Sequence, residues 1–336
     1  MPSNTLISIL LPVYNALPYL EECLQSIVNQ SEQNWELIAI DDQSTDDSWI
    51  LLKEFVQKDH RIRCFQTKEK GIIPALRMAF AESKGNLITR MDADDRMPIH
   101  KLSRLKTLLL EKGPRHISTG LVKYFSESTL GDGYQRYENW LNQLTLNDRH
   151  YEDIYRECVI ASPCWMIFRE DLINCGAFES NRYPEDYDLC FRFYQAAYKV
   201  VRSEEVLHFW RDHANRSSRN DPNYANQQYF NLKTPYFLDL DYDPNRPLIL
   251  WGAGKKGKIL AQQLLNADLS FHWLTNNAKK QGKDIYGVIL VSEKMLEKLE
   301  APQFIIAVAG PDDQAVIQSY FDKMNWKAGK DYFFFC

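Results

Sequence analysis

Three aspartates, Asp92, Asp94 and Asp95, stand close together in the stretch RMDADDR at residues 90–96. They follow an apolar run that predicts a buried strand. Like charges ~4 Å apart repel each other by about 4 kcal/mol at an effective dielectric constant of about 20, so the group either faces open water or holds a cation. Oxygen ligands suit Mg²⁺ or Mn²⁺, and Mg²⁺ usually completes its shell with water and substrate phosphates. The D-x-D spacing therefore predicts a metal site for a nucleoside diphosphate.

The elements that position these acids alternate from the start of the chain. Their β-α-β-α order predicts a mostly parallel sheet with helices on both faces. Ligands of open α/β sheets bind beyond the carboxyl ends of the strands, and polar groups at 12–15, 41–42 and 92–95 occupy three such ends. We therefore expect one crevice, where Arg77 and Arg90 could balance the acids or meet phosphate. The predicted strands of this sheet are 7–13, 35–40, 61–66 and 87–91.

Two further polar clusters lie later in the chain. Glu185, Asp186 and Asp188 begin an apolar helical stretch in YPEDYDLCFRF. Acids in the first turn of a helix interact favourably with its dipole, which accounts for some of these acids without any chemistry. His213 lies among basic and hydroxyl residues within 208–219, a mixture that suits phosphate.

Length and composition exclude several classes of protein. The 336 residues are enough for about two domains of roughly 150 residues each. The formal net charge is only -5 and both signs are mixed, so we expect no nucleic-acid partner. No apolar run reaches the ~18 residues of a membrane span, and the N-terminus lacks the features of a signal peptide. The seven scattered cysteines favour neither disulfides nor zinc, so we expect a reducing, cytoplasmic compartment.

The sequence also predicts where the domains divide. The stretch DLDYDPNRP, rich in Asp and Pro, predicts a linker at 239–247. It separates a first domain, 1–238, from a second domain, 248–336. Within the first domain, residues 126–157 are polar and aromatic without a regular pattern, and such long irregular segments are often binding loops.

The second domain contains a glycine loop. WGAGKKG matches G-x-G-x-x-G between a predicted strand and helix, with Gly252, Gly254 and Gly257 as its glycines. Amides of such a loop can hold a phosphate at the helix N-terminus. However, the next strand ends in TNN, without the acid that binds the ribose of NAD. This weighs against a bound dinucleotide, and we rank a nucleotide or sugar-nucleotide ligand and a docking role equally with it. The glycines could also serve only the tight turn and the close helix packing.

Five motifs together resemble the family 2 glycosyltransferases, which have the GT-A nucleotide-diphospho-sugar transferase fold. A lone D-x-D is weak evidence, but five motifs in the same order are specific. The likeness covers residues 5–220, and the C-terminal part resembles the small Rossmann-like modules found beside sugar-processing enzymes. The motifs are PVYN (12–15), IDDQSTDDS (40–48), RMDADD (90–95), PEDYDLCFR (184–192) and RDHANRSS (211–218).

The resemblance implies how the nucleotide is bound. An acid after the second strand contacts the nucleoside base, which points to Asp41 or Asp42. The PVYN stretch, with Pro12, Tyr14 and Asn15, lines the nucleotide pocket.

The resemblance also implies a catalytic arrangement. Asp92 and Asp94 match the metal-diphosphate motif, with Asp94 as the more direct ligand, and His213 matches a position that closes the site over the metal. Asp186 matches the base that takes a proton from the attacking sugar hydroxyl, which gives inversion at the anomeric carbon. Asp95 is left to hold the loop or to cap the next helix.

Cofactor and partners follow from the same resemblance. We expect Mn²⁺ or Mg²⁺, a nucleotide-sugar donor with a UDP-sugar favoured, and a sugar or lipid-linked acceptor in cell-surface polysaccharide or glycolipid synthesis. NAD(P) at the second domain is the disfavoured alternative. A peripheral position at the inner face of the membrane is an alternative to a purely cytoplasmic one, because acceptors in this family are often lipid-linked.

Three other functions remain alternatives. A sugar-phosphate nucleotidyltransferase would need a glycine-rich basic loop after the first strand, where this chain has PVYNALPYL. A nucleotide-sugar-binding regulatory protein would keep the pocket without transferring the sugar. A bifunctional enzyme would add redox chemistry at the second domain, and this version requires nicotinamide binding there.

Overall fold

The computed structural model describes residues 5–126, 131–214, 216–224 and 226–336. Contacts within the chain divide it into two compact units. The first unit comprises Met1–His150 and Val159–Asn220, and the second comprises Tyr151–Cys158 and Asp221–Cys336. This division differs from the predicted one, because residues 221–238 and a short segment of the predicted first domain belong to the second unit.

A seven-stranded sheet forms the centre of the first unit, in the order β3-β2-β1-β4-β6-β5-β7. Only β6 runs antiparallel to its neighbours β4 and β5, which confirms the predicted mostly parallel α/β sheet. The strands are β1 Ile7–Val13, β2 Trp35–Asp41, β3 Ile62–Gln66, β4 Leu87–Arg90, β5 His116–Phe125, β6 Trp165–Phe168 and β7 Lys199–Arg211. The helices are α1 Leu17–Val28, α2 Ser48–Lys58, α3 Ile72–Glu82, α4 Lys101–Lys112, α5 Asp132–Leu146, α6 Arg169–Asn174, α7 Glu185–Gln195 and α8 Ser217–Asn220.

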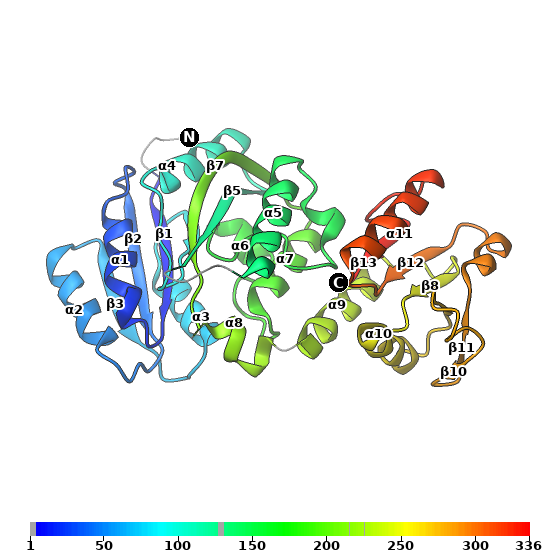
Figure 1. Ribbon diagram of the computed structural model, residues 1–336. Helices are drawn as coiled ribbons and strands as arrows, with labels where there is room; N and C mark the ends of the chain where they lie inside the picture. Colours follow the sequence, from blue (N-terminus) through cyan, green and yellow to red (C-terminus); the bar gives the residue numbers. More distant parts are fainter. Residues whose placement is uncertain (1–4, 127–130, 215, 225) are drawn as a thin grey trace. The chain divides into compact units, whose positions relative to one another are not determined.

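Helices cover both faces of this sheet (Figure 1). Side chains alternate along a strand, and Ile7, Ile9 and Leu11 of β1 share one core with apolar side chains of α1, α2 and α4. On the other face α3 packs against β1 and β2 and buries Leu76 and Ala79. Full burial of each large aliphatic side chain stabilises the folded state by about 1.5–3 kcal/mol. This packing supports the carboxyl edge of the sheet, where the polar residues of the candidate site lie.

The segment 126–157 is more regular than predicted. Helix α5 occupies Asp132–Leu146 and buries Leu141, Leu144 and Thr145 on one face, so the prediction of an irregular segment is wrong there. Residues 127–130 of that segment lie outside the described residues.

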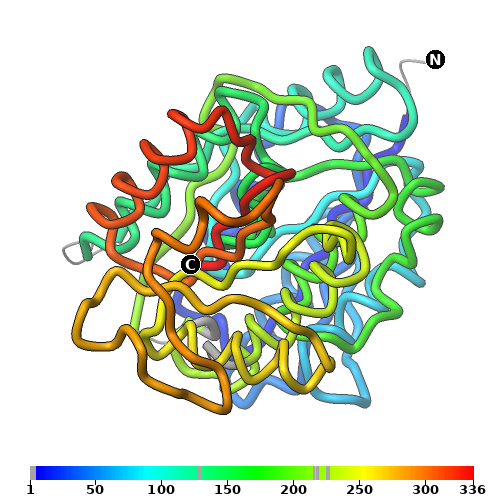
Figure 2. Tube along the Cα trace, turned by 90° about the vertical axis from the view of Figure 1, so that its right-hand side faces the viewer, coloured from blue at the N-terminus to red at the C-terminus, as the bar shows by residue number. Residues whose placement is uncertain are grey.

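A six-stranded sheet forms the second unit, in the order β10-β11-β9-β8-β12-β13. All pairs are parallel except β10 with β11, so the predicted small α/β unit is confirmed. Figure 2 traces this unit from α10, in yellow, to α11, in red. The strands are β8 Leu248–Trp251, β9 His272–Leu274, β10 Asp284–Ile285, β11 Val288–Val291, β12 Gln303–Ile306 and β13 Tyr332–Phe334. The helices are α9 Asn226–Leu240, α10 Lys255–Asn266 and α11 Pro311–Lys323, and the 3₁₀ segments of the chain are η1 His150–Asp153, η2 Pro222–Tyr224 and η3 Glu293–Lys298.

Aromatic packing explains why the segment Tyr151–Cys158 belongs to the second unit. The ring of Tyr155 stacks on Phe335 with centroids 5.2 Å apart, and it meets Phe237 of α9 edge to face at 5.6 Å. Its hydroxyl donates a hydrogen bond to Asp241 at 2.5 Å. The side chain of Gln303 in β12 donates to the Asp241 carbonyl at 2.7 Å. The start of the predicted linker is therefore fixed inside the second unit.

The glycine loop after β8 gives a stability prediction. A Cβ atom on Gly257 would lie 1.9 Å from the Gly252 carbonyl oxygen, whereas a Cβ atom on Gly254 would meet no atom within 4 Å. Gly257→Ala is therefore expected to lower the free energy of unfolding by about 3 kcal/mol or more. The matched change Gly254→Ala is expected to cost about 1 kcal/mol at most, as for a helix N-cap. Urea denaturation of both variants measures the difference, and equal losses would contradict the packing role of Gly257.

Candidate functional site

Arg90 joins two elements that are far apart in the sequence. Its Nε donates to Asp92 Oδ1 at 2.9 Å, and its Nη1 donates to Glu185 Oε1 at 2.9 Å. The side chains of Arg90 and Glu185 are each 6% exposed. The end of β4 is thereby tied to the first residue of α7. The structure therefore shows Arg90 paired with two acids, and its contact with phosphate stays a prediction.

Asp186 follows Glu185 in the first turn of α7. Burial raises the pKa of Asp186 to about 7, and the adjacent Glu185 carboxylate adds to this shift. Arg90 and the backbone amide of Tyr187 act in the opposite direction. A carboxylate whose pKa lies near neutrality can accept a proton efficiently at neutral pH, which fits the predicted base.

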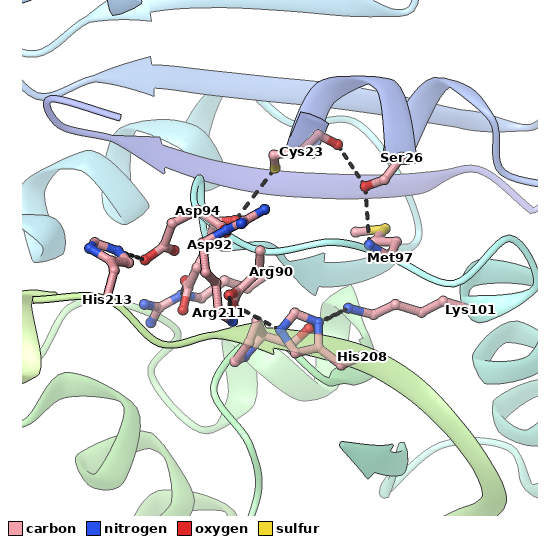
Figure 3. A network of polar contacts seen from close by, with 12 residues as sticks. Cys23, Ser26, Arg90, Asp92, Asp94, Met97, Lys101, His208, Arg211 and His213 are labelled. Atoms are coloured by element: carbon pink, nitrogen blue, oxygen red, sulfur yellow. Dashed lines mark hydrogen bonds and ion pairs between the residues drawn. The ribbon is translucent and has the colours of Figure 1, made fainter. Parts of the chain in front are cut away.

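Asp94 and His213 meet across the site, as Figure 3 shows. His213 Nε2 lies 2.9 Å from Asp94 Oδ2, and the imidazole packs against the ring of Tyr19 with centroids 4.6 Å apart. The Asp94 side chain is 27% exposed, so an ion or substrate can reach it. Two of the three predicted metal ligands are thus brought together.

The third predicted ligand, Asp92, is paired with Arg90 and 22% exposed. In the part of the chain that the structure describes, no three Asp, Glu, His or Cys side chains converge tightly enough to form a metal site alone. Mg²⁺ typically uses only one or two protein carboxylates and takes other ligands from water and phosphate. The residues present therefore fit an ion that is completed by a bound diphosphate.

Asp95 forms hydrogen bonds that hold neighbouring segments of the chain together. It accepts hydrogen bonds from His208 Nε2 at 2.9 Å and from the Arg211 amide at 2.7 Å. Lys101 Nζ lies 3.1 Å from His208 Nδ1 (Figure 3). The same nitrogen donates to the Pro163 carbonyl at 2.5 Å. Asp95, His208 and Lys101 are all buried. Of the two predicted roles, Asp95 therefore holds the loop, because it fixes the end of β7 beside the D-x-D residues.

Burial also sets the charge states of this network. It raises the pKa of Asp95 well above its usual value, with Asp94 and Asp92 adding to the shift. It lowers the pKa of His208 well below its usual value, so the imidazole is neutral. As Lys101 faces Nδ1, the ring proton belongs on Nε2, from which it is donated to Asp95.

The ends of β1 and β2 form the other part of the candidate site. Asp42 accepts the Gly71 amide with both carboxylate oxygens, at 2.8 and 2.9 Å. Asp41 is fully buried and accepts one hydrogen bond from Gln66 at 3.0 Å, and its Oδ1 has no partner among the described residues. Tyr14 is 45% exposed and its hydroxyl accepts from Lys70 at 3.0 Å.

Neighbouring PVYN residues shape this edge. Asn15 has a left-handed backbone (φ 47°), and its side chain accepts the Thr45 amide at 2.8 Å. Pro12 lies within β1, in register with Ile40 of β2. The structure thus brings the first two strand ends together, as expected.

Arg77 of α3 contacts the loop before α7. Its guanidinium donates to the carbonyls of Phe178 and Glu179, both at 3.1 Å, and to Asn181 Oδ1 at 3.0 Å. These bonds fasten α3 to the loop before α7. The structure shows Arg77 in contact with this loop, and its predicted role toward phosphate or the acids stays a prediction.

The glycine loop of the second unit is held by its own domain. The Gly252 carbonyl accepts from Trp273 Nε1 at 2.9 Å, and the Ala253 carbonyl accepts from Lys280 at 2.8 Å. Asn276, which stands where a dinucleotide site carries an acid, accepts from Trp251 Nε1 at 3.1 Å. These contacts support the turn-and-packing interpretation for Gly252 and Gly257.

A separate pocket of about 420 Å³ lies in the second unit, and sequence reasoning missed it. It is formed by residues of α11 and η3 together with the ends of β8 and β9, and the loop glycines do not line it. Its polar and aromatic lining includes Trp251, Asn276, Glu293, Tyr320 and Lys323.

Several site residues carried no signal that we used. Glu185 was interpreted only as a first-turn acid, and Lys101 was not identified. Arg211 donates through Nε to the Asp94 carbonyl at 2.8 Å and also pairs with Glu22. The apolar run at 206–210, interrupted only by His208, could have identified the end of β7 and thereby the placement of His208.

The fold and this edge of acids define a class of nucleotide-binding α/β protein with the ligand beyond the carboxyl ends of parallel strands. The profile of Glycosyl transferase family 2 matches residues 8–176, half of the chain. The chain belongs to this family of glycosyltransferases, which transfer sugars from nucleotide-sugar donors.

Curated relatives agree with this membership. GlyG, a glycosyltransferase of Streptococcus pneumoniae, is 28% identical over 217 residues, which cover 62% of this chain and 71% of GlyG. GlyA of the same organism is 28% identical over 213 residues, or 61% of this chain but only 30% of GlyA. TuaG of Bacillus subtilis, a putative teichuronic acid biosynthesis glycosyltransferase, is 28% identical over 166 residues, 49% of this chain and 63% of TuaG.

Solved structures confirm the GT-A fold. TarS of S. aureus, in complex with UDP-GlcNAc, is similar with a TM-score of 0.55 and 16% identity, over 77% of this chain and 71% of that one. The mannosyltransferase PcManGT of Pyrobaculum calidifontis, in complex with GDP-Man and Mn²⁺, has a TM-score of 0.51 and 17% identity, over 77% of this chain and 69% of that one.

Proposed function

We propose that this glycosyltransferase is metal-dependent and inverts the anomeric configuration, with Asp186 as its base. The observation that carries the proposal is the bridge from Asp92 through Arg90 to Glu185. The bridge keeps the start of α7, and with it Asp186, beside the D-x-D residues. A base and a diphosphate-binding group are therefore held by one buried arginine.

The reaction follows from the chemistry of these groups. A sugar hydroxyl attacks the anomeric carbon while Asp186 takes its proton, and the nucleoside diphosphate leaves from the opposite face. This single displacement inverts the anomeric centre. A divalent cation, when bound, neutralises the charge that grows on the leaving phosphate. Asp94 and His213, with Asp92 alongside, are the residues that would hold it.

We extend the proposal to the donor and the acceptor of the reaction. TarS binds UDP-GlcNAc and PcManGT binds GDP-Man, so a nucleoside diphosphate sugar is supported, and we favour a UDP-sugar. The name of TuaG supports an acceptor in cell-surface polysaccharide or glycolipid synthesis. Across the described parts of the chain, none of the helices is long and apolar enough to cross a membrane.

A donor screen by thermal shift tests the proposal. UDP-, GDP- and other nucleotide sugars are added to the full chain with and without Mn²⁺. We expect one donor class to raise the melting temperature only when the metal is present, because metal and diphosphate complete each other's binding. Failure of every donor to stabilise the protein would contradict the proposal.

The pH dependence of transfer gives a second test. The base acts only when it is deprotonated, and the pKa of Asp186 is raised to about 7. We therefore expect kcat/KM to be low below pH 7, to rise as the pH passes through about 7, and then to level off. A profile that is flat between pH 5 and 8 would contradict Asp186 as the base.

A further inference from the structure

The pocket of the second unit takes no part in the proposed reaction. Its volume of about 420 Å³ lies within the range of roughly 300–1,000 Å³ that is typical of small-ligand sites. The connection from β11 to β12 contains only η3, with six residues, whereas α11, with 13 residues, connects β12 to β13. The pocket is the space that this short segment leaves open beside α11.

Apolar and aromatic side chains form one part of the pocket lining. Trp251 and Ile317 are buried members of the hydrophobic core of this unit. The partly buried ring of Tyr320 meets the ring of Trp251 edge to face, with centroids 5.8 Å apart. Trp251 Nε1 donates to Asn276 at 3.1 Å, which fixes the orientation of the indole. A fixed aromatic surface of this kind can pack against the apolar face of a ligand ring.

Polar side chains of both charges complete the lining. Glu293 and Lys323 are exposed, and within the described parts of the chain neither side chain forms a hydrogen bond or an ion pair. Ser319 and Asn276 add a hydroxyl and an amide. Burial raises the pKa of Tyr320, and the Glu293 carboxylate raises it further, so the phenol stays protonated and can donate a hydrogen bond.

The balance of these groups favours one class of ligand. One carboxylate and one ammonium leave the lining formally neutral, so it favours neither an anion nor a cation. Sugar hydroxyls both donate and accept hydrogen bonds, which suits a lining where Glu293 accepts and Lys323 donates. The C–H face of a sugar ring supplies the apolar surface that packs against an aromatic side chain. A nucleotide fits less well, because its phosphate would meet Glu293 and the glycine-loop amides do not line the pocket.

We propose that this pocket binds a neutral saccharide, a sugar unit of the acceptor glycan. The inference rests on the proposed function where it names the acceptor as the source of the sugar. Binding here gives the glycan a second attachment to the enzyme, which raises its effective concentration there. The competing interpretation is a surface hollow that holds only water.

Saturation-transfer NMR with neutral saccharides tests the inference. Glucose, galactose, N-acetylglucosamine, rhamnose, maltose and lactose are titrated into the full chain in EDTA, without a donor. We expect at least one of them to bind. Glu293→Ala and Lys323→Ala are each expected to weaken this binding by about tenfold or more, because each removes a charge-assisted hydrogen bond. Tyr320→Ala removes the aromatic contact and is expected to weaken it at least as much.

A matched variant controls for a general change of surface charge. Lys294→Ala removes an exposed cation of η3 that does not line the pocket, so saccharide binding should not change. Because Glu293 and Lys323 are exposed and unpaired within the described parts of the chain, their variants keep the test valid if Tyr320→Ala does not fold.

The possible outcomes separate this inference from the proposed function. Absence of saccharide binding, or binding that none of the pocket variants weakens, would overturn the inference. Binding of uridine monophosphate that Lys323→Ala and Tyr320→Ala both abolish would also overturn it, in favour of a nucleotide site. The titrations need neither donor nor metal, so a failed donor screen would contradict the proposed function and leave the saccharide site intact.

Discussion

Replacing Asp186 with asparagine is expected to abolish sugar transfer and to leave donor binding intact. The amide keeps the size of the carboxylate but cannot take the acceptor proton, and general base catalysis contributes about 10²–10⁴-fold. Stability should stay the same or rise, because burial and Glu185 disfavour the ionised Asp186, as its raised pKa shows. Transfer rates, donor affinity and melting temperature of one preparation measure all three effects.

Asp188→Asn is the matched control in the same helical turn. Asp188 is 1% exposed and pairs with Arg192 at 2.9 Å, so this change should lower stability and leave the rate per folded molecule nearly unchanged. If Asp186→Asn kept transfer within about tenfold of the wild type, Asp186 would not be the base.

The strand ends were the predictable part of the site. Apolar runs followed at once by acids or PVYN predict parallel strands that end at one edge, and β1, β2 and β4 meet there in register. Asp92 and Asp94 could be found because their spacing is local. The same holds for the α/β sheet of the second unit, whose strand-loop-helix order is read directly from the chain.

The contacts that connect distant segments could not be predicted. Arg90 and Glu185 are 95 positions apart, and the partner of a buried arginine depends on packing that no local pattern records. Nothing in the local sequence distinguishes Lys101 at the start of α4, yet it is fully buried, donates to the Pro163 carbonyl and faces His208 Nδ1.

The later elements were missed for a similar reason. Charged residues in the middle of β7, among them Arg202, Glu204 and Glu205, interrupt its apolar pattern, although neighbouring β5 pairs with it along most of its length. The close approach of β5 and β7 is reflected in the sequence by Gly120, because a Cβ atom at this position would lie 2.6 Å from Leu207. The pattern of polar and aromatic residues in α5 likewise hides a narrow buried face.

Asp94→Asn is expected to remove the response to the metal. It takes one negative charge from the pair that Asp94 forms with His213, so Mn²⁺ should no longer enhance donor binding. Because a metal contributes several kcal/mol of charge stabilisation in the transition state, transfer should fall by about 10³-fold. Thermal shifts with a donor, measured at increasing Mn²⁺ concentration, check the binding effect, and the transfer rate checks the chemistry.

The contact between Asp94 and His213 also predicts how substitutions of these two residues combine. If Asp94 and His213 hold one ion, Asp94→Asn with His213→Gln should lose little more than Asp94→Asn alone, because the ion is already gone. Asp47→Asn, at an exposed acid before α2, controls for a general loss of negative charge and should keep the response to Mn²⁺. Fully additive losses for Asp94 and His213, or an unchanged response to the metal in Asp94→Asn, would place the cation elsewhere and leave the pair a purely structural contact.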